Sequence, residues 1–148
     1  MDSKFRSLLT SETRIKVSST LDNSVGKKCL TDGDPETCWT SQQGTPQSIQ
    51  LSFPSPVIPR KIALTFQGGF VGTRCSVQVL PSQIGLEKPK WQSYSQIFPE
   101  DVNRRQNFDL PVELLQNGVE SLKLVFEESS DFFGRITVYD LQLEGECL

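Results

Sequence analysis

Three carboxylates lie within five positions of the stretch LTDGDPETCWTS, residues 30–41: Asp32, Asp34 and Glu36. Carboxylate oxygens bind hard cations such as Ca²⁺, which takes about six to eight oxygen ligands. They also serve general acid–base catalysis, which needs two acids placed across a cleft. The same residue types form turns, since Asp34 before Pro35 suits a cap. The stretch is therefore compatible with a metal loop, an acidic catalytic pair or a structural turn.

The catalytic alternative finds little support in the rest of the chain, which contains no histidine. Without histidine there is no Ser-His-Asp or Cys-His relay and no His-ligated metal. An enzyme would have to rely on carboxylate, lysine or tyrosine chemistry alone, and no second acidic motif complements residues 30–41. We expect no enzymatic activity and assign no catalytic residue.

The charge balance argues against a nucleic-acid partner. The 148 residues carry 15 Lys and Arg against 18 Asp and Glu, a net charge of −3. Proteins that bind nucleic acid directly usually concentrate positive charge on one face. The basic pairs Lys27-Lys28, Arg60-Lys61 and Arg104-Arg105 are scattered in the sequence. We interpret them as ordinary solvated surface.

The sequence gives no sign of export or of a membrane span. No apolar run approaches the ~18 residues of a membrane span, and the start lacks the apolar core of a signal peptide. The cysteines, Cys29, Cys38, Cys75 and Cys147, form no C-x-x-C pair, so a zinc ribbon is unsupported. We interpret them as mostly buried small apolar side chains. An intracellular protein, in nucleus or cytoplasm, is expected.

Apolar and polar residues alternate wherever the chain is apolar. The clearest cases are residues 49–53, 62–66, 77–79 and 122–126. A period of two indicates half-buried antiparallel strands. Turn signals separate them at 53–56, 67–69 and 117–118. We predict an all-β antiparallel jelly-roll sandwich, formed by one domain over residues 13–148 after a flexible segment at 1–12.

The last apolar segment contains a change of phase. Ile136 and Val138 share one alternation, whereas Leu141 and Leu143 share the other. One extra residue in a β-bulge near Tyr139 would produce this shift. Two separate strands with a bend between them would also produce it.

Several motifs resemble the discoidin family, also called the coagulation-factor type C or galactose-binding-like domains. They are VSSTLDNSVGKKCLTDGDPETCWTS, SIQLSF, IALTF and RITVYDLQLEGEC, and the similarity as a whole extends over residues 15–147. The stretches FQGGF, FPEDVNRRQNF and DFFGR resemble a narrower intracellular group within this fold, which associates with an orphan nuclear receptor. This resemblance implies a non-enzymatic protein-interaction domain that represses receptor-driven transcription.

The resemblance also suggests a calcium site. Lectin-like members hold structural Ca²⁺ with residues that correspond here to Asp32, Asp34 through its carbonyl, Thr37 and Glu144. The alternative is a structural turn that directs Trp39 into the core. Secreted members join a cysteine near the start to the one after the last strand. Residues 1–28 contain no cysteine, so Cys147 cannot pair in that way, which fits a reducing compartment.

Loop aromatics with nearby arginines are the predicted partner-binding residues: Phe70, Arg74, Phe132, Phe133 and Arg135. In the family, ligand-binding aromatic and basic residues lie on loops at one end of the sandwich. Exposed aromatics beside arginine also suit protein interfaces. We expect at least one of the three Phe side chains to be buried, because Phe is usually interior.

Two other functions remain open at this stage. One is a carbohydrate- or lipid-binding module. The chain has only two Trp and two Tyr, too few for the usual stacking on sugars, so a glycan or small-molecule ligand is not expected. The other is a β-sandwich subunit of an intracellular assembly. The sequence does not separate the latter from a receptor partner.

Overall fold

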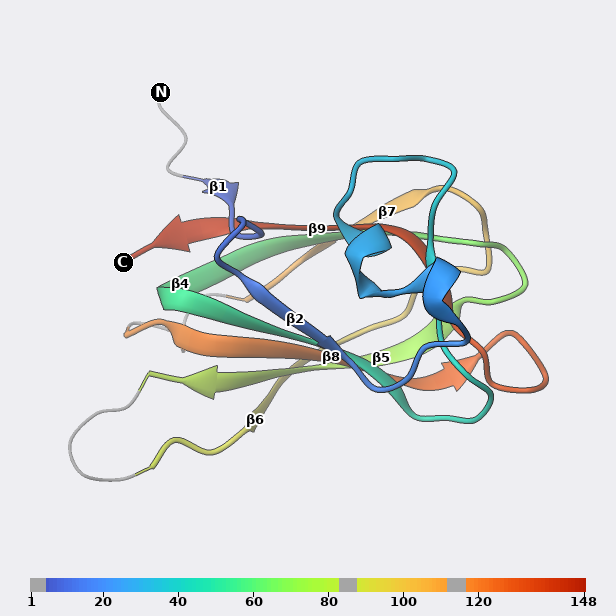
Figure 1. Cartoon of the computed structure of the whole chain (residues 1–148). Coiled ribbons are helices and arrows are strands. Elements are labelled where there is room, and N and C mark those ends of the chain that lie inside the picture. The colour runs from blue at the N-terminus through green and yellow to red at the C-terminus, as the bar shows by residue number, and fades with distance from the viewer. Residues whose placement is uncertain (1–4, 83–87, 112–116) are drawn as a thin grey trace.

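The computed structural model describes residues 5–82, 88–111 and 117–148 (Figure 1). The strands are β1 (Arg6–Ser7), β2 (Arg14–Val17), β3 (Trp39–Thr40), β4 (Gln47–Phe66), β5 (Gly72–Pro81), β6 (Gln92–Ile97), β7 (Arg105–Asp109), β8 (Val119–Ser129) and β9 (Thr137–Cys147). Two short 3-10 helices, η1 (Asn23–Val25) and η2 (Lys27–Leu30), lie between β2 and β3. Every strand pair is antiparallel. The predicted all-β fold is confirmed. The stretch PVELLQ at 111–116, whose sequence predicts a short helical turn, falls largely outside the described residues.

The long strand β4 belongs to both layers of the sandwich. Its first part, 47–52, pairs with β2 and β8, and β8 continues to β5 and β6. Its second part, 57–66, pairs with β9 and β7. The register shifts between Ser52 and Val57, where we predicted a turn between two strands. Pro54 and Pro56 lack an N–H for the ladder and are accommodated at such an irregularity. The predicted turn is therefore a bend within one strand.

The phase change in the last strand is a β-bulge. Val138 pairs with Phe66 and Asp140 pairs with Thr65, so Tyr139 is the extra residue. The strand continues unbroken as β9 from Thr137 to Cys147. Because the bulge switches the alternation, both Val138 and Leu141 are buried.

The packed structure begins before residue 13, the domain boundary that the sequence predicts. Arg6 and Ser7 pair with Gly145 and Glu144 of β9. Leu8 is buried and its N–H donates to the carbonyl of Leu143. Residues 6–8 therefore belong to the packed structure, because one apolar side chain and an edge-strand ladder hold them there. Residues 1–4 of the expected flexible segment lie outside the described residues.

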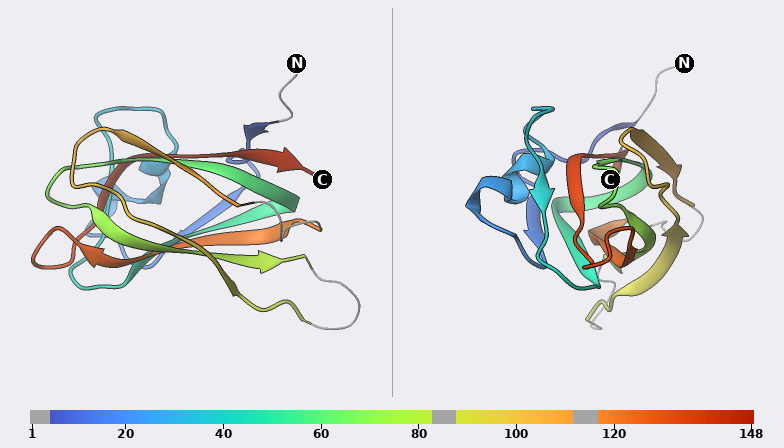
Figure 2. Two further views of the ribbon diagram at one scale, coloured as in Figure 1. Left: turned by 180° about the vertical axis from the view of Figure 1, so that it is seen from behind. Right: turned by 90° about the vertical axis from the view of Figure 1, so that its right-hand side faces the viewer.

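The strands surround a central region in the end-on view of Figure 2, and the buried apolar side chains form one cluster that draws on both layers. Phe66 of β4 and Phe126 of β8 meet edge to face with ring centroids 5.7 Å apart, a favoured aromatic geometry. Trp39 is fully buried, and its indole N–H donates to the carbonyl of Ser19 at 3.0 Å. The predicted burial of Trp39 is confirmed.

The cysteines differ from the expectation that most are buried. Only Cys75 is buried, and Cys147 is exposed; Cys29 and Cys38 lie in between. Burial raises the pKa of the Cys75 thiol, which is therefore a packing residue. All four thiols are free. No helix among the described residues is long and apolar enough to span a membrane.

Candidate functional site

Several loops converge at one end of the sandwich, where β4 leads into β5 and β8 leads into β9. The N–H of Gly69 donates to Asp101 Oδ1 at 2.7 Å. Ser130 Oγ donates to the same oxygen at 3.2 Å and accepts from the N–H of Val71 at 2.9 Å. The loops at 67–71, 98–104 and 129–136 are thus joined by hydrogen bonds and form one surface.

The loop between β8 and β9, SDFFGRI, is held by its own hydrogen bonds. The carboxylate of Asp131 accepts from both the backbone N–H and the Nε of Arg135, each at 3.0 Å. Ser129 Oγ donates to the carbonyl of Arg135 at 2.6 Å. The N–H of Gly44 donates to the carbonyl of Phe133 at 2.7 Å. These contacts fix the loop backbone at its base and present its tip to solvent.

Arg135 organises the aromatic residues around it. Its guanidinium carbon lies 5.1 Å from the centre of the Phe70 ring and 5.9 Å from that of Phe133, within the range of a cation–π interaction. Phe132 meets Phe133 edge to face at 5.3 Å. We call Phe70, Phe132, Phe133 and Arg135 the loop-tip cluster. The structure thus brings together four of the five predicted partner-binding residues.

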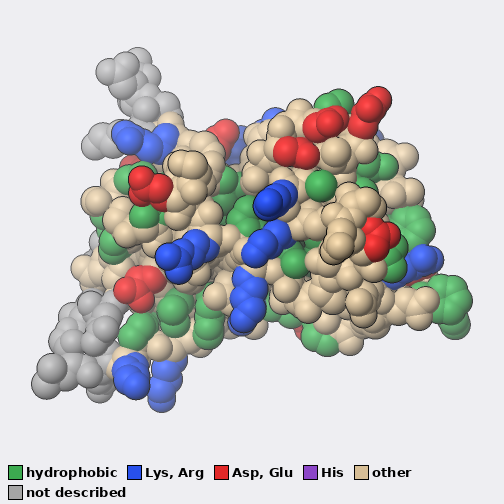
Figure 3. Space-filling model, viewed as in Figure 1, with side chains coloured by type: hydrophobic (Ala, Val, Ile, Leu, Met, Phe, Trp, Pro, Cys, Tyr) green, Lys and Arg blue, Asp and Glu red, His purple; other side chains and the backbone are tan. Residues whose placement is uncertain are grey.

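The two adjacent Phe side chains project into solvent. Phe132 is 94% exposed and Phe133 is 54% exposed, while Phe70 is partly buried. Figure 3 shows apolar side chains protruding at the end of the molecule where this loop lies. The expectation that at least one of the three is buried is wrong: Phe70 is only partly buried, and Phe132 and Phe133 lie on the exposed part of their loop.

Arg74, the fifth predicted residue, is engaged elsewhere. It lies on β5 opposite Glu128 of β8. Its guanidinium forms ion pairs with Glu127 at 3.6 Å and with Glu128 at 3.5 Å. The structure therefore places it in a cross-strand charge network on the sheet and outside the loop-tip cluster.

The acidic stretch at 30–41 forms a turn closed by its own side chains. Asp32 Oδ2 accepts from the Thr37 hydroxyl at 2.5 Å, and Oδ1 accepts from the N–H of Asp34 at 3.0 Å. The N–H of Glu36 donates to Asp34 Oδ1 at 2.9 Å. The Thr37 hydrogen bond, followed by that of Asp34, lowers the pKa of the Asp32 carboxyl.

The predicted calcium ligands are only partly brought together. Asp32, Asp34 and Thr37 share the turn, but Glu144 lies on β9 opposite Ser7 and Lys61. Within the described ranges, no group of three or more His, Cys, Asp and Glu side chains could hold a metal ion. Both oxygens of Asp32 already accept hydrogen bonds. The hydrogen bonds account for a structural turn without an ion, and calcium binding by these residues stays a prediction.

Asp131 contacts the loop-tip cluster, although the sequence analysis did not single it out. The hydrogen bond from Arg135 lowers the pKa of its carboxyl, and the charge of Arg135 adds to the effect. The sequence does contain a sign of this contact. Asp131 precedes Arg135 by four residues, with Phe-Phe-Gly between them, and an ion pair at this spacing can close a short loop. Asp131 positions Arg135 and, through it, both flanking rings.

Comparisons with known proteins place the chain in a family. The nuclear receptor 2C2-associated protein of Danio rerio is 41% identical over 143 residues, which cover 95% of this chain and 96% of the relative. The Homo sapiens protein of the same name is 38% identical over 143 residues with the same coverage. The chain belongs to the nuclear receptor 2C2-associated protein family. The narrower resemblance noted in the sequence is thereby confirmed.

Solved structures support the discoidin-like fold of this nuclear receptor 2C2-associated family member. An F5/8 type C domain from Bacteroides fragilis matches with a TM-score of 0.76 at 13% identity, covering 99% of this chain and 100% of that one. The family 32 carbohydrate-binding module of NanJ from C. perfringens, solved with galactose, matches with a TM-score of 0.73 at 14% identity, covering 95% and 98%. No family model matches the chain. At these identities the structural matches show the fold alone.

Proposed function

We propose that this domain is a non-enzymatic interaction module that binds a nuclear receptor of the 2C2 type through the loop-tip cluster and represses receptor-driven transcription. The observation that carries the proposal is the exposed Phe132-Phe133 pair on a loop fixed by hydrogen bonds. The names of the relatives support the receptor as the partner. We infer that the protein acts inside the cell, in the nucleus or the cytoplasm.

Burial of the two Phe rings supplies the affinity in this proposal. Covering a large apolar side chain contributes about 1.5–3 kcal/mol, and a loop already fixed by hydrogen bonds loses less conformational entropy on binding. Arg135 adds a planar cation held between two rings, with its charge offset by Asp131. Aromatic residues and arginine dominate the binding energy of most protein interfaces.

The test is the affinity of the double variant Phe132→Ala/Phe133→Ala for purified nuclear receptor 2C2, measured by surface plasmon resonance. We expect binding to fall about thirtyfold or more. The melting temperature should hardly change, because both rings are mainly exposed. The matched control is Phe5→Ala, an exposed Phe on the segment that packs near the C-terminus. Equal binding by the double variant and the wild type would rule out the loop-tip cluster as the docking surface.

A carbohydrate ligand is the alternative for the same surface. Exposed Phe rings beside Arg135 could stack on a sugar, and the fold is shared with a module solved with galactose. A glycan array discriminates the two functions. Clear glycan binding that is lost in Phe132→Ala/Phe133→Ala, together with no binding to the receptor, would replace the proposed function.

A further inference from the structure

A groove with basic side chains crosses the face of the molecule shown in Figure 3. It lies between β2 and η2 and includes a hollow of about 680 Å³, whose lining contains Arg14, Lys16, Lys27 and Lys28. A second hollow of about 590 Å³ shares Lys16, Lys27 and Lys28 with the first. The three lysines therefore lie where the two hollows adjoin, and we call the two hollows together the basic groove.

The positive charge of the basic groove has no counter-charge in the groove itself. Neither hollow has an Asp or Glu in its lining. Where the structure describes the chain, the ion pairs involve other arginines, and all four groove cations are exposed. Like charges held on neighbouring segments repel one another, so an anionic ligand would relieve this repulsion.

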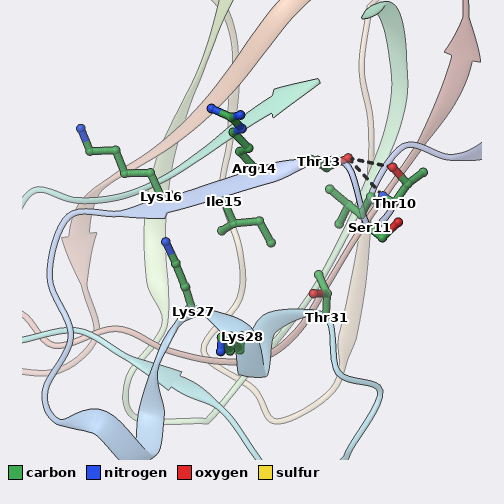
Figure 4. A pocket seen from close by; sticks show the side chains of 10 residues that line it. Thr10, Ser11, Thr13, Arg14, Ile15, Lys16, Lys27, Lys28 and Thr31 are labelled. Atoms are coloured by element: carbon green, nitrogen blue, oxygen red, sulfur yellow. Dashed lines mark hydrogen bonds between the residues drawn. The ribbon is translucent and has the colours of Figure 1, made fainter. Parts of the chain in front are cut away.

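The floor of the basic groove is apolar. Leu9, Ile15 and Val17 line it and pack against the core from partly exposed positions. Figure 4 shows Ile15 pointing from β2 toward the space next to η2, while Lys27 reaches up from the opposite wall. Arg14 and Lys16 extend from the other side of β2. The charge beside the apolar floor therefore comes from Lys27 and Lys28 of η2, and Arg14 and Lys16 add positive charge across β2, which suits a ligand that combines acidic and apolar groups.

We propose that the basic groove binds an extended acidic segment of a partner protein, with carboxylates on the lysines and apolar side chains on the floor. The apolar floor continues through two adjoining hollows that share Lys16, Lys27 and Lys28, which fits a chain better than one small anion. A nucleic acid fits less well, because the whole protein carries a net charge of −3. This surface differs from the loop-tip cluster, and the inference does not depend on the proposed function.

The test is fluorescence anisotropy with a labelled peptide of about ten residues, roughly 33 Å when extended, in which Glu and Asp alternate with Val and Ser. Saturable binding is expected, and it should weaken as salt rises because exposed charges are screened. The same peptide with Gln and Asn in place of the acids should bind at least about tenfold more weakly. Phe132→Ala/Phe133→Ala should bind the acidic peptide as the wild type does, which separates this inference from the proposed function.

The decisive variant is Lys27→Gln/Lys28→Gln, with Lys88→Gln/Lys90→Gln as control. Both doubles remove two exposed lysines and the same charge, but only the first touches the groove. We expect about a tenfold loss for the first and less than a twofold change for the second. Equal losses in the two doubles, an unchanged affinity in the first, or tighter binding of a single-stranded oligonucleotide than of the peptide would each overturn the proposal.

Discussion

The loop-tip cluster and the basic groove are built in opposite ways. Three of the four members of the cluster lie within residues 132–135, and Asp131 next to them holds Arg135 in place. The groove takes its cations from β2 and from η2, which are separate in the sequence and meet only in the fold. The cluster presents apolar rings, whereas the groove presents unpaired positive charge. A binding loop whose residues are contiguous can be recognised in the sequence, whereas a surface formed by residues of separate elements cannot.

The two regions should also respond differently to the same perturbation. Binding at the cluster depends on apolar area and on the loop backbone, so it should be insensitive to salt and sensitive to loop geometry. Binding in the groove depends on several exposed charges, so it should be sensitive to salt and indifferent to the loop. The predictions below test these differences one residue or one ligand at a time.

The largest effect is expected from Gly134→Ala, which damages the loop-tip cluster. Gly134 has a φ of +81°, and an added Cβ would lie 2.9 Å from the backbone of Gly44. The left-handed conformation alone costs about 1–2 kcal/mol for a residue with a side chain, and the close contact adds to this cost. We expect a loss of about 2 kcal/mol or more of unfolding free energy in urea, and loss of receptor binding.

Gly33→Ala is the matched control for that change. Gly33 also has a positive φ, +72°, but an added Cβ would meet nothing within 4 Å. It should therefore cost only the conformational part, about 1–2 kcal/mol, and leave receptor binding unchanged. Equal losses of stability in the two variants would show that the packing of Gly134 on Gly44 contributes nothing.

An intermediate effect is expected from Asp131→Asn, which removes the charge that holds Arg135. The amide retains an oxygen acceptor for the N–H of Arg135, so the loop backbone should persist. Receptor affinity should fall about fivefold, the equivalent of ~1 kcal/mol. Binding of the acidic peptide to the basic groove should stay the same. A variant with full receptor affinity would assign no positioning role to Asp131.

The pH dependence of the same group gives a second check. Arg135 lowers the pKa of the Asp131 carboxyl below its ordinary value of 3.8. A lowered pKa in the folded state means that the contribution to stability is complete above the unfolded value and is lost as pH falls through the folded pKa. Carboxyl ¹³C NMR titration should give a pKa below 3.8 for Asp131. An unshifted value would contradict the ion pair.

The smallest effect is expected from adding calcium. The residues concerned lie in the acidic turn at 30–41, which follows η2. The Asp32 carboxylate is already occupied by Thr37 and Asp34, so we propose that the turn needs no ion. Thermal melting in excess Ca²⁺ and in a chelator should give the same melting temperature, since a ligand that binds only the folded state would raise it. A rise with Ca²⁺ would restore the predicted site of Asp32, Asp34, Thr37 and Glu144.

Local patterns in the sequence were sufficient for much of the fold. Alternation identified the strands now seen in β4, β5 and β8, and the phase change at Tyr139 identified the bulge in β9. The prolines at 54 and 56 misled, because a proline pair marks a break in the ladder but does not say whether the chain reverses. The sequence singles out Phe70, Phe132, Phe133 and Arg135, and the structure places them together on neighbouring loops, while their role in partner binding stays a prediction.

The sequence by itself determined the fold class, the family and the contiguous loop, because strand periodicity, turn residues and short motifs are local properties of the chain. Only the tertiary structure decided that Arg74 is engaged by Glu127 and Glu128. It alone decided that Lys27 and Lys28, interpreted from the sequence as ordinary surface, line a groove with Arg14 and Lys16. The physical reason is that charge acts through space, and the folding of β2 against η2 sets which charges are neighbours.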